Sequence, residues 1–195
     1  MMLAIVGLAA VVVLAAIVLV VLVVLAVIAI YNGLVRKRMQ CREAWSQIDV
    51  QLKRRYDLIP NLIETVKGYA AHEKETLERV IQARNQAIAV PPGQVAQQAQ
   101  AENVLTGALR QIFALAESYP NLKANENFSQ LQEELASTEN RIAFARQYYN
   151  DSVSLYNTAV QVFPNNLLAG MFGFQAMEFF QIEQAGEREA PKVKF

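Results

Sequence analysis

The sequence predicts an all-α protein. We expect an N-terminal transmembrane helix that continues into an antiparallel, up-down-up-down four-helix bundle, with an aromatic-rich C-terminal segment after it. Three observations predict this fold. Residues 1–30 carry no charged side chain. Later stretches place apolar residues at steps of three and four, as in helices. No stretch alternates apolar and polar residues in the pattern of a strand pair. The expected parts are an anchor at 1–30, a bundle at 31–163 and a C-terminal segment and tail at 164–195.

The apolar run at 1–30 is interpreted as a retained membrane anchor. A helix crosses the hydrocarbon core of a bilayer with about 20 apolar residues, and this run is longer. A cleaved signal peptide begins with basic residues and has an apolar stretch of about 7–15 residues. This chain begins Met1-Met2-Leu3 and has no Lys or Arg before the run ends. We therefore expect the anchor to stay on the protein.

Positive charge follows the anchor and does not precede it. The cations that flank the membrane are Arg36, Lys37, Arg38 and Arg42. Because cationic flanks are retained on the cytoplasmic side, we expect a single-pass protein with its N-terminus outside and its bundle in the cytoplasm. The single cysteine, Cys41, permits no intrachain disulfide and fits a reducing compartment.

The first helix is expected to leave the membrane and to end at a turn over residues 57–60. Ile59 precedes a proline, and a residue in that position disfavours helical angles. Asn61 and Glu64 have the spacing of a capping box. The sequence therefore predicts that the second helix begins at Asn61.

Further breakers divide the rest of the bundle. Pro91-Pro92-Gly93 ends the second helix, and Tyr119-Pro120-Asn121 separates the third from the fourth. The fourth helix carries apolar residues at alternating steps of three and four from Leu131 to Phe163, which is typical of a bundle seam. Short connections make neighbouring helices antiparallel. The chain after Phe163 is therefore expected near the membrane surface.

The segment at 163–180 is too apolar for a disordered tail. It holds five of the nine phenylalanines and a single charge, Glu178, whereas disordered tails are poor in aromatics and rich in charge. Packing within the chain's own bundle is one interpretation. The other is contact with the membrane or with a neighbouring subunit, proposed for Phe172, Phe174, Phe179 and Phe180.

We expect no enzyme activity, cofactor or metal site. His72 is the only histidine and Cys41 the only cysteine, and these two give no zinc ligand set. The 18 cations balance the 18 anions, which argues against a nucleic-acid partner. The cations at 53–55 are interpreted as a solvated helix end, and a ligand-binding patch is the alternative.

Motifs of a known family recur over residues 31–87 and at two later places. They are Tyr31-Asn32, Leu34-Val35, Ala44-Trp45-Ser46, the run 48–55, the run 57–62, the run 66–70, His72-Glu73, Leu77-Glu78 and Ala83-Arg84, followed by Phe163-Pro164 and Phe172-Gly173-Phe174. In these motifs the sequence resembles the LemA family. Two departures are Met39-Gln40-Cys41 and Tyr56, which replace residues more usual in the family.

The resemblance implies a membrane anchor with a short start outside the cytoplasm of a bacterium, a helical bundle inside it and no catalytic residues. Some relatives are associated with organising internal membranes, which makes a structural role plausible by analogy. We therefore expect a protein of the bacterial inner membrane that is a self-assembling scaffold, is homo-oligomeric through its anchor and C-terminal segment, and organises or remodels membrane. The alternative is an adaptor that presents its bundle to a membrane protease, a sensor or another cytoplasmic partner.

Overall fold

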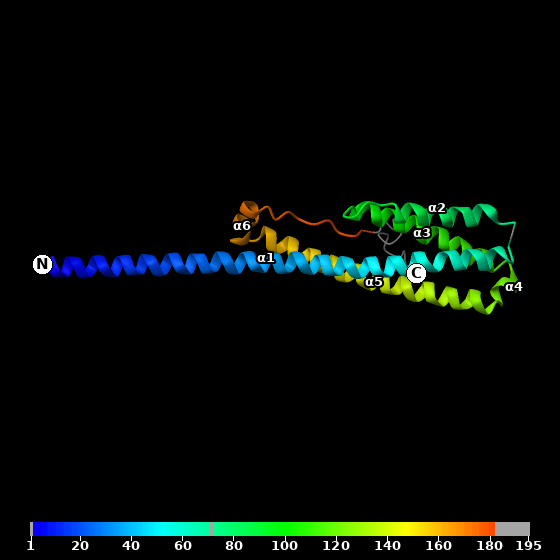
Figure 1. Ribbon diagram of the computed structural model, residues 1–195, viewed down its shortest axis with the longest axis horizontal. Coiled ribbons are helices and arrows are strands. Elements are labelled where there is room, and N and C mark those ends of the chain that lie inside the picture. Colours follow the sequence, from blue (N-terminus) through cyan, green and yellow to red (C-terminus); the bar gives the residue numbers. More distant parts are fainter. Residues whose placement is uncertain (1, 71, 182–195) are drawn as a thin grey trace, which may run out of the picture. The chain divides into compact units, whose positions relative to one another are not determined.

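The computed structural model describes residues 2–70 and 72–181, and helices dominate this part of the chain (Figure 1). Within these ranges no residue lies in a strand, so the all-α prediction is confirmed. The described residues form six helices where four were expected, because a single turn and an eight-residue helix add to the longer ones. They are α1 Met2–Lys67, α2 Lys74–Ile88, α3 Val95–Ala116, α4 Pro120–Lys123, α5 Glu126–Gln161 and α6 Asn165–Phe172.

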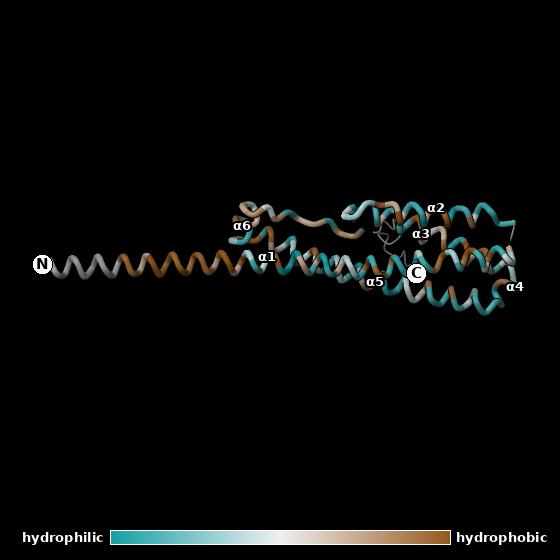
Figure 2. The backbone as a smooth tube through the Cα atoms, in the orientation of Figure 1, coloured by the Kyte–Doolittle hydropathy of each residue, from teal (hydrophilic) through white to brown (hydrophobic). Residues whose placement is uncertain are grey.

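The N-terminal apolar run and the residues that follow it form one uninterrupted helix, α1. Figure 2 shows its hydrophobic stretch and the change to mixed polarity farther along the helix. Large side chains from Val13 to Leu25 are 49% to 64% exposed, so this stretch finds little cover within the chain. By length and composition, α1 is able to cross a membrane.

The predicted turn at 57–60 is wrong, because α1 continues through Pro60 to Lys67. A proline within a helix removes the N–H that would bond the carbonyl four residues earlier. That carbonyl belongs to Tyr56, and Arg84 Nε of α2 donates to it at 2.8 Å. Burial of the apolar residues after Pro60 also favours the continued helix. Asn61 is therefore interior to α1, and the second long helix begins at Lys74.

The chain divides into two compact units, and α1 and α5 each contribute to both. The first unit comprises residues 1–42 and 152–177, and the second comprises 43–151 with the chain from 178 onward. Within the second unit, α2 and α3 lie side by side (Figure 1). Its core draws on α1 through α5 and consists of Ile59, Leu62, Ile63, Val66, Ala70, Leu77, Val80, Ala83, Ala87, Leu105, Ala108, Leu109, Ile112, Ala116, Leu122, Phe128 and Leu135.

The first unit has a smaller core, in which α6 and Phe174 pack on α1. The rings of Phe172 and Phe174 stand edge-on to the ring of Tyr31, with centroids 5.0 and 5.6 Å away. The buried residues of this unit are Leu34, Cys41, Ser152, Val153, Tyr156, Ala159, Ala169 and Phe174.

Gly173 ends α6 in the left-handed conformation, with φ +69°. Its amide and the amide of Phe174 both donate to the carbonyl of Ala169. A residue with a Cβ is strained at such a φ, which is why glycine is common at this position after a helix. The cap turns the chain so that Phe174 reaches Tyr31.

Gly173→Ala should destabilise the end of α6 by about 1 kcal/mol, the cost of placing a Cβ in the left-handed region. Gly170→Ala is the matched control, because it lies inside α6 and an added Cβ meets no atom within 4 Å. There alanine should stabilise the helix by about 0.5–1 kcal/mol. Amide hydrogen exchange over 169–174 measures both effects. Slower exchange in both variants would contradict the assigned cap.

Candidate functional site

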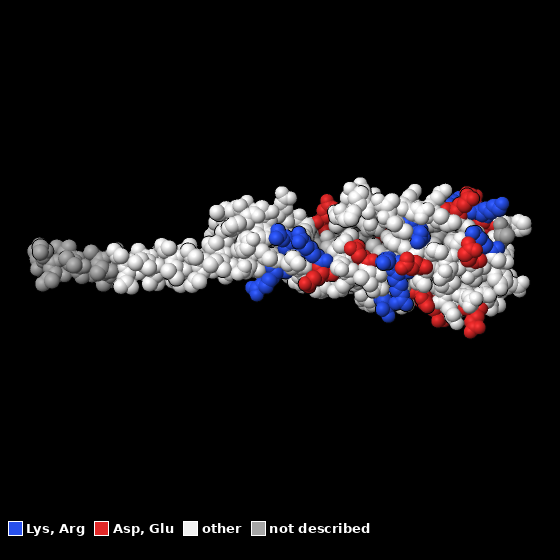
Figure 3. All heavy atoms as spheres, viewed as in Figure 1, with Lys and Arg blue, Asp and Glu red and all other residues white. Residues whose placement is uncertain are grey.

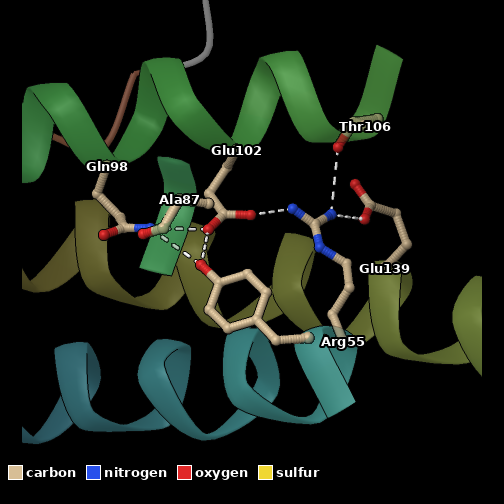
Figure 4. Close-up of polar contacts among 7 residues, drawn as sticks. Arg55, Ala87, Gln98, Glu102, Thr106 and Glu139 are labelled. Atoms are coloured by element: carbon tan, nitrogen blue, oxygen red, sulfur yellow. Dashed lines mark hydrogen bonds and ion pairs between the residues drawn. The ribbon is translucent and has the colours of Figure 1, made fainter. Parts of the chain in front are cut away.

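The most unusual polar feature of the second unit is a buried arginine. Arg55 of α1 is 1% exposed. Its Nη2 forms an ion pair with Glu102 of α3, and its Nη1 forms an ion pair with Glu139 of α5. Nη1 also donates to Thr106 Oγ1 of α3 at 3.2 Å. As Figure 4 shows, the guanidinium therefore links three helices.

Glu102 extends this cluster toward α2. Its Oε1 accepts hydrogen bonds from the Tyr56 hydroxyl and, at 2.7 Å, from Gln98 Nε2. Gln98 Nε2 also lies 3.3 Å from the carbonyl of Ala87 in α2 (Figure 4). We call Arg55, Tyr56, Gln98, Glu102, Thr106 and Glu139 the buried ion cluster.

The surroundings of Tyr56 keep its hydroxyl protonated. Burial raises the pKa of Tyr56, and the negative charge of Glu102 and its hydrogen bond raise that pKa further. Tyr56 therefore remains a hydrogen-bond donor at neutral pH. It lies well outside the apolar run, which ends at Ile30. In the family that the sequence resembles, a histidine is more usual at this position, and a histidine ring N–H is also able to donate a hydrogen bond to Glu102.

The chemistry of the cluster suits helix packing better than catalysis. An arginine stays charged in proteins and has no acceptor atom, while both carboxylates are occupied by donors. Among the described residues no group of three or more His, Cys, Asp or Glu side chains could hold a metal ion. A buried charge is tolerated only when it is paired and hydrogen-bonded. The cluster therefore links α1, α3 and α5 through buried charges that are paired and hydrogen-bonded.

The interpretation of residues 53–55 as a solvated helix end is wrong for Arg55, although Lys53 and Arg54 are exposed. Arg54 Nη2 forms only a partly exposed pair with Glu134, at 3.7 Å. The missed signal lies in the seam of α1. Arg55 continues the three-and-four spacing of Leu52 and Ile59, so a charge occupies a core position of the pattern.

The four membrane-flanking cations follow the apolar part of α1. Arg36 and Arg42 are exposed, and Lys37 and Arg38 are half-buried. The Arg38 guanidinium lies 4.9 Å from the centroid of the Phe174 ring, within the range of a cation–π contact. Figure 3 shows an uncharged visible face on the apolar stretch of α1 before the first basic side chains.

The four phenylalanines proposed for assembly or membrane contact fall into two classes. Phe174 and Phe180 are buried within the chain, and Phe180 packs beside Trp45 at a centroid distance of 5.9 Å. Phe172 and Phe179 keep exposed faces. The assembly or membrane contacts predicted for all four side chains remain predictions.

Two asparagines of α5 hold the extended chain after α6 by its backbone. In the first unit, Asn157 accepts from the Met177 amide at 2.8 Å and donates to the Met177 carbonyl at 2.9 Å. In the second unit, Asn150 does the same for Phe180 at 2.9 and 3.1 Å. The Tyr149 hydroxyl also donates to the Glu178 carbonyl at 2.9 Å. We call Asn150 and Asn157 the asparagine clamps.

An open groove of about 570 Å³ lies in the second unit between α3 and the clamped chain. Its large apolar side chains, Val104 and Phe179, are exposed. Its lining residues are Ala96, Gln100, Asn103, Val104, Glu178, Phe179 and Gln181.

Glu102→Gln should lower the free energy of unfolding by about 3 kcal/mol, because it removes the fully buried partner of Arg55. Glu139→Gln should cost about 1 kcal/mol, since its side chain is 41% exposed. The control is Glu75→Gln, which breaks an exposed pair with Arg79 and should cost at most about 0.5 kcal/mol. Denaturant unfolding of the full chain in detergent gives all three values. Equal losses for Glu102→Gln and Glu75→Gln would contradict the importance of the cluster.

Asn157→Ala should accelerate hydrogen exchange of the Met177 amide about fivefold, because it removes a hydrogen bond worth about 1 kcal/mol. Asn150→Ala should do the same at Phe180. Asn140→Ala, an exposed position of the same helix, should leave both amides unchanged. Unchanged exchange in all three variants would show that other contacts hold this segment.

Comparisons with known proteins agree with the resemblance in the sequence. The LemA family model matches residues 44–195. Magnetosome protein MamQ 1 of Paramagnetospirillum magneticum is 27% identical over 181 residues, which cover 80% of this chain and 66% of the relative. Magnetosome protein MamQ of Magnetospirillum gryphiswaldense is 24% identical with the same coverage.

A third relative bears the family's own name. Protein LemA of Metamycoplasma hominis is 26% identical over 156 residues, which cover 78% of this chain and 69% of the relative. This chain spans just under two thirds of the length of the MamQ relatives. The family model, by contrast, matches well over half of this chain. The protein therefore belongs to the LemA family.

Proposed function

We propose that this protein is a membrane-anchored scaffold of the LemA type. It crosses the bacterial inner membrane once, assembles with copies of itself through its anchor and C-terminal segment, and organises or remodels the bilayer. The observation that carries this proposal is the long, exposed apolar part of α1.

The length of the apolar run favours assembly over simple anchoring. Residues 2–30 span about 44 Å of helix, against a hydrocarbon core of about 30 Å. A tilt of up to about 40° does not absorb the surplus. Packing against identical helices would cover it, and small residues such as Gly7, Ala15, Ala26 and Ala29 permit close approach.

The orientation follows from charge. The four cations after the apolar run are the first charges of the chain, and a cationic flank favours the cytoplasmic side. We therefore infer that the N-terminus lies outside and the second unit in the cytoplasm.

For the second unit we propose an antiparallel bundle of α1, α2, α3 and α5, with α4 as a turn between α3 and α5. The shared apolar core of these helices and the buried ion cluster support it. Short connections between successive helices favour the antiparallel arrangement.

A role without catalysis is part of this proposal. Arg55 and Glu102, the most deeply buried ionic groups, are engaged with each other. Burial raises the pKa of the Cys41 thiol, which disfavours the reactive thiolate. Both observations support a structural role for the polar interior.

The groove beside α3 favours a second candidate function, that of an adaptor. Val104 and Phe179 expose apolar surface in the groove, and a partly exposed apolar groove with polar neighbours suits a peptide or helix of a partner. In this alternative the protein acts as a monomer and presents the groove to a membrane-bound or cytoplasmic protein.

Mass measurement of the full chain in mild detergent tests the scaffold against the adaptor. A uniform particle of many copies is expected. Replacing Ala15, Ala26 and Ala29 together by leucine should reduce the mass, because larger side chains separate the helix backbones while the run stays apolar.

The matched control replaces Val13, Val18 and Val21 by leucine, which changes shape but little volume. It should leave the mass unchanged. A monomer for the unmodified chain would overturn the scaffold proposal and favour the adaptor.

A further inference from the structure

Charge is divided very unevenly between the two compact units. Residues 1–42 and 152–177, which make up the first unit, hold four cations and no Asp or Glu. All 18 acidic residues of the chain lie outside these ranges. The charged side chains of the first unit are therefore all cationic, and they follow directly after the apolar part of α1.

The same unit exposes large apolar side chains around α6. Phe163, two residues before the start of α6, is 78% exposed, and Met171 is 77% exposed. Leu167 and Met171 are four residues apart and therefore share one face of the helix. Leu167 and Phe172 are also at least half exposed. These fractions show that most of this face is left uncovered by the described residues, although the ring of Phe172 also contacts Tyr31.

The contact with Tyr31 places α6 at one particular level of α1. Tyr31 is the residue directly after the apolar run, and Phe172 and Phe174 both pack on its ring. The cations from Arg36 to Arg42 lie roughly 8 to 16 Å farther along the helix axis. An aromatic residue at the end of an apolar span is typical of the boundary between hydrocarbon and headgroups.

We propose that Phe163 and the exposed face of α6 insert into the cytoplasmic leaflet of an anionic bilayer, at the boundary between acyl chains and headgroups. This proposal rests on the anchoring of α1 proposed above. Helices that lie in an interface bury their apolar face about 5–10 Å deep. The adjacent cations then lie at headgroup level, where anionic lipids attract them.

Charge complementarity favours lipid over the first unit of a second copy as the occupant of this face, which leaves the chain after α6 for the contact with copies proposed above. The first unit of a second copy would bring four cations and no Asp or Glu toward the four cations of this unit, and like charges repel. An anionic leaflet supplies both the apolar depth for α6 and the negative charge for Arg36, Lys37, Arg38 and Arg42. Helix α6 would add a second attachment to the membrane beside the spanning helix.

Fluorescence quenching in vesicles tests this proposal on the full chain. In a Trp45→Phe background, Phe172→Trp places a single reporter on α6, and Met171→Trp serves as a second reporter. The vesicles contain phosphatidylcholine and phosphatidylglycerol, with bromine near the headgroup end or near the middle of the acyl chains. Both reporters should lose emission mainly to bromine near the headgroup end.

Two matched reporters separate this inference from the anchoring of α1. Leu22→Trp should be quenched by bromine near the middle of the chains. Phe144→Trp lies on α5 in the second unit, where the native ring is 73% exposed, and should not be quenched. If Leu22→Trp is not quenched, α1 does not span the bilayer, and both the proposed anchoring and this inference are refuted.

Quenching at Leu22→Trp without quenching at positions 171 and 172 would overturn the inference alone. Emission at long wavelength would then place α6 in water, and unquenched emission at short wavelength would place it against a second copy. In vesicles without phosphatidylglycerol, quenching at 172 should weaken while quenching at Leu22→Trp persists. Equal quenching at 172 in both kinds of vesicle would refute the role of anionic lipid.

Discussion

The second unit depends on the pairing of the Arg55 guanidinium. A charge that is 1% exposed cannot remain in a protein interior without neutralising partners, and here α3 and α5 supply them through Glu102 and Glu139. Rotation or axial slip of any of the three helices would leave the charge unpaired, whereas an apolar contact tolerates small shifts. The apolar core supplies most of the driving force for packing, and the ion pairs add a geometric requirement on how the three helices meet.

How far the sequence predicts this fold depends on which physical signal dominates locally. The breaker at 91–93 lies between α2 and α3 as predicted, and the break expected at 119–121 does separate α3 from the last long helix, although Pro120 and Asn121 already belong to α4. Pro60 is the counterexample. Local sequence predicts a turn there, but Arg84 from another helix satisfies the carbonyl that the proline leaves unbonded, and buried residues beyond it keep the helix continuous. A contact between residues 28 positions apart is invisible to a local pattern.

The polar interior was harder to predict than the helices. Arg55 stands on the apolar seam of α1, so its burial has a sequence signature, but the identity of its partners does not. Glu102 and Glu139 are two of many carboxylates in the chain, and nothing in their spacing distinguishes them before the helices are packed. The asparagine clamps are similarly hidden, because the groups they bind are backbone amides and carbonyls that every residue except proline possesses.

The binding of backbone groups by the asparagine clamps has an evolutionary consequence. A clamp that binds only the main chain does not depend on the side chain it holds, so Met177 is free to vary among relatives without loss of its attachment to Asn157. Phe180 has less freedom, because its ring also packs beside Trp45. Selection should therefore act more strongly on Asn150 and Asn157 than on much of the segment that they position. Family members could then diversify the side chains presented along this segment while its path over α5 stays the same.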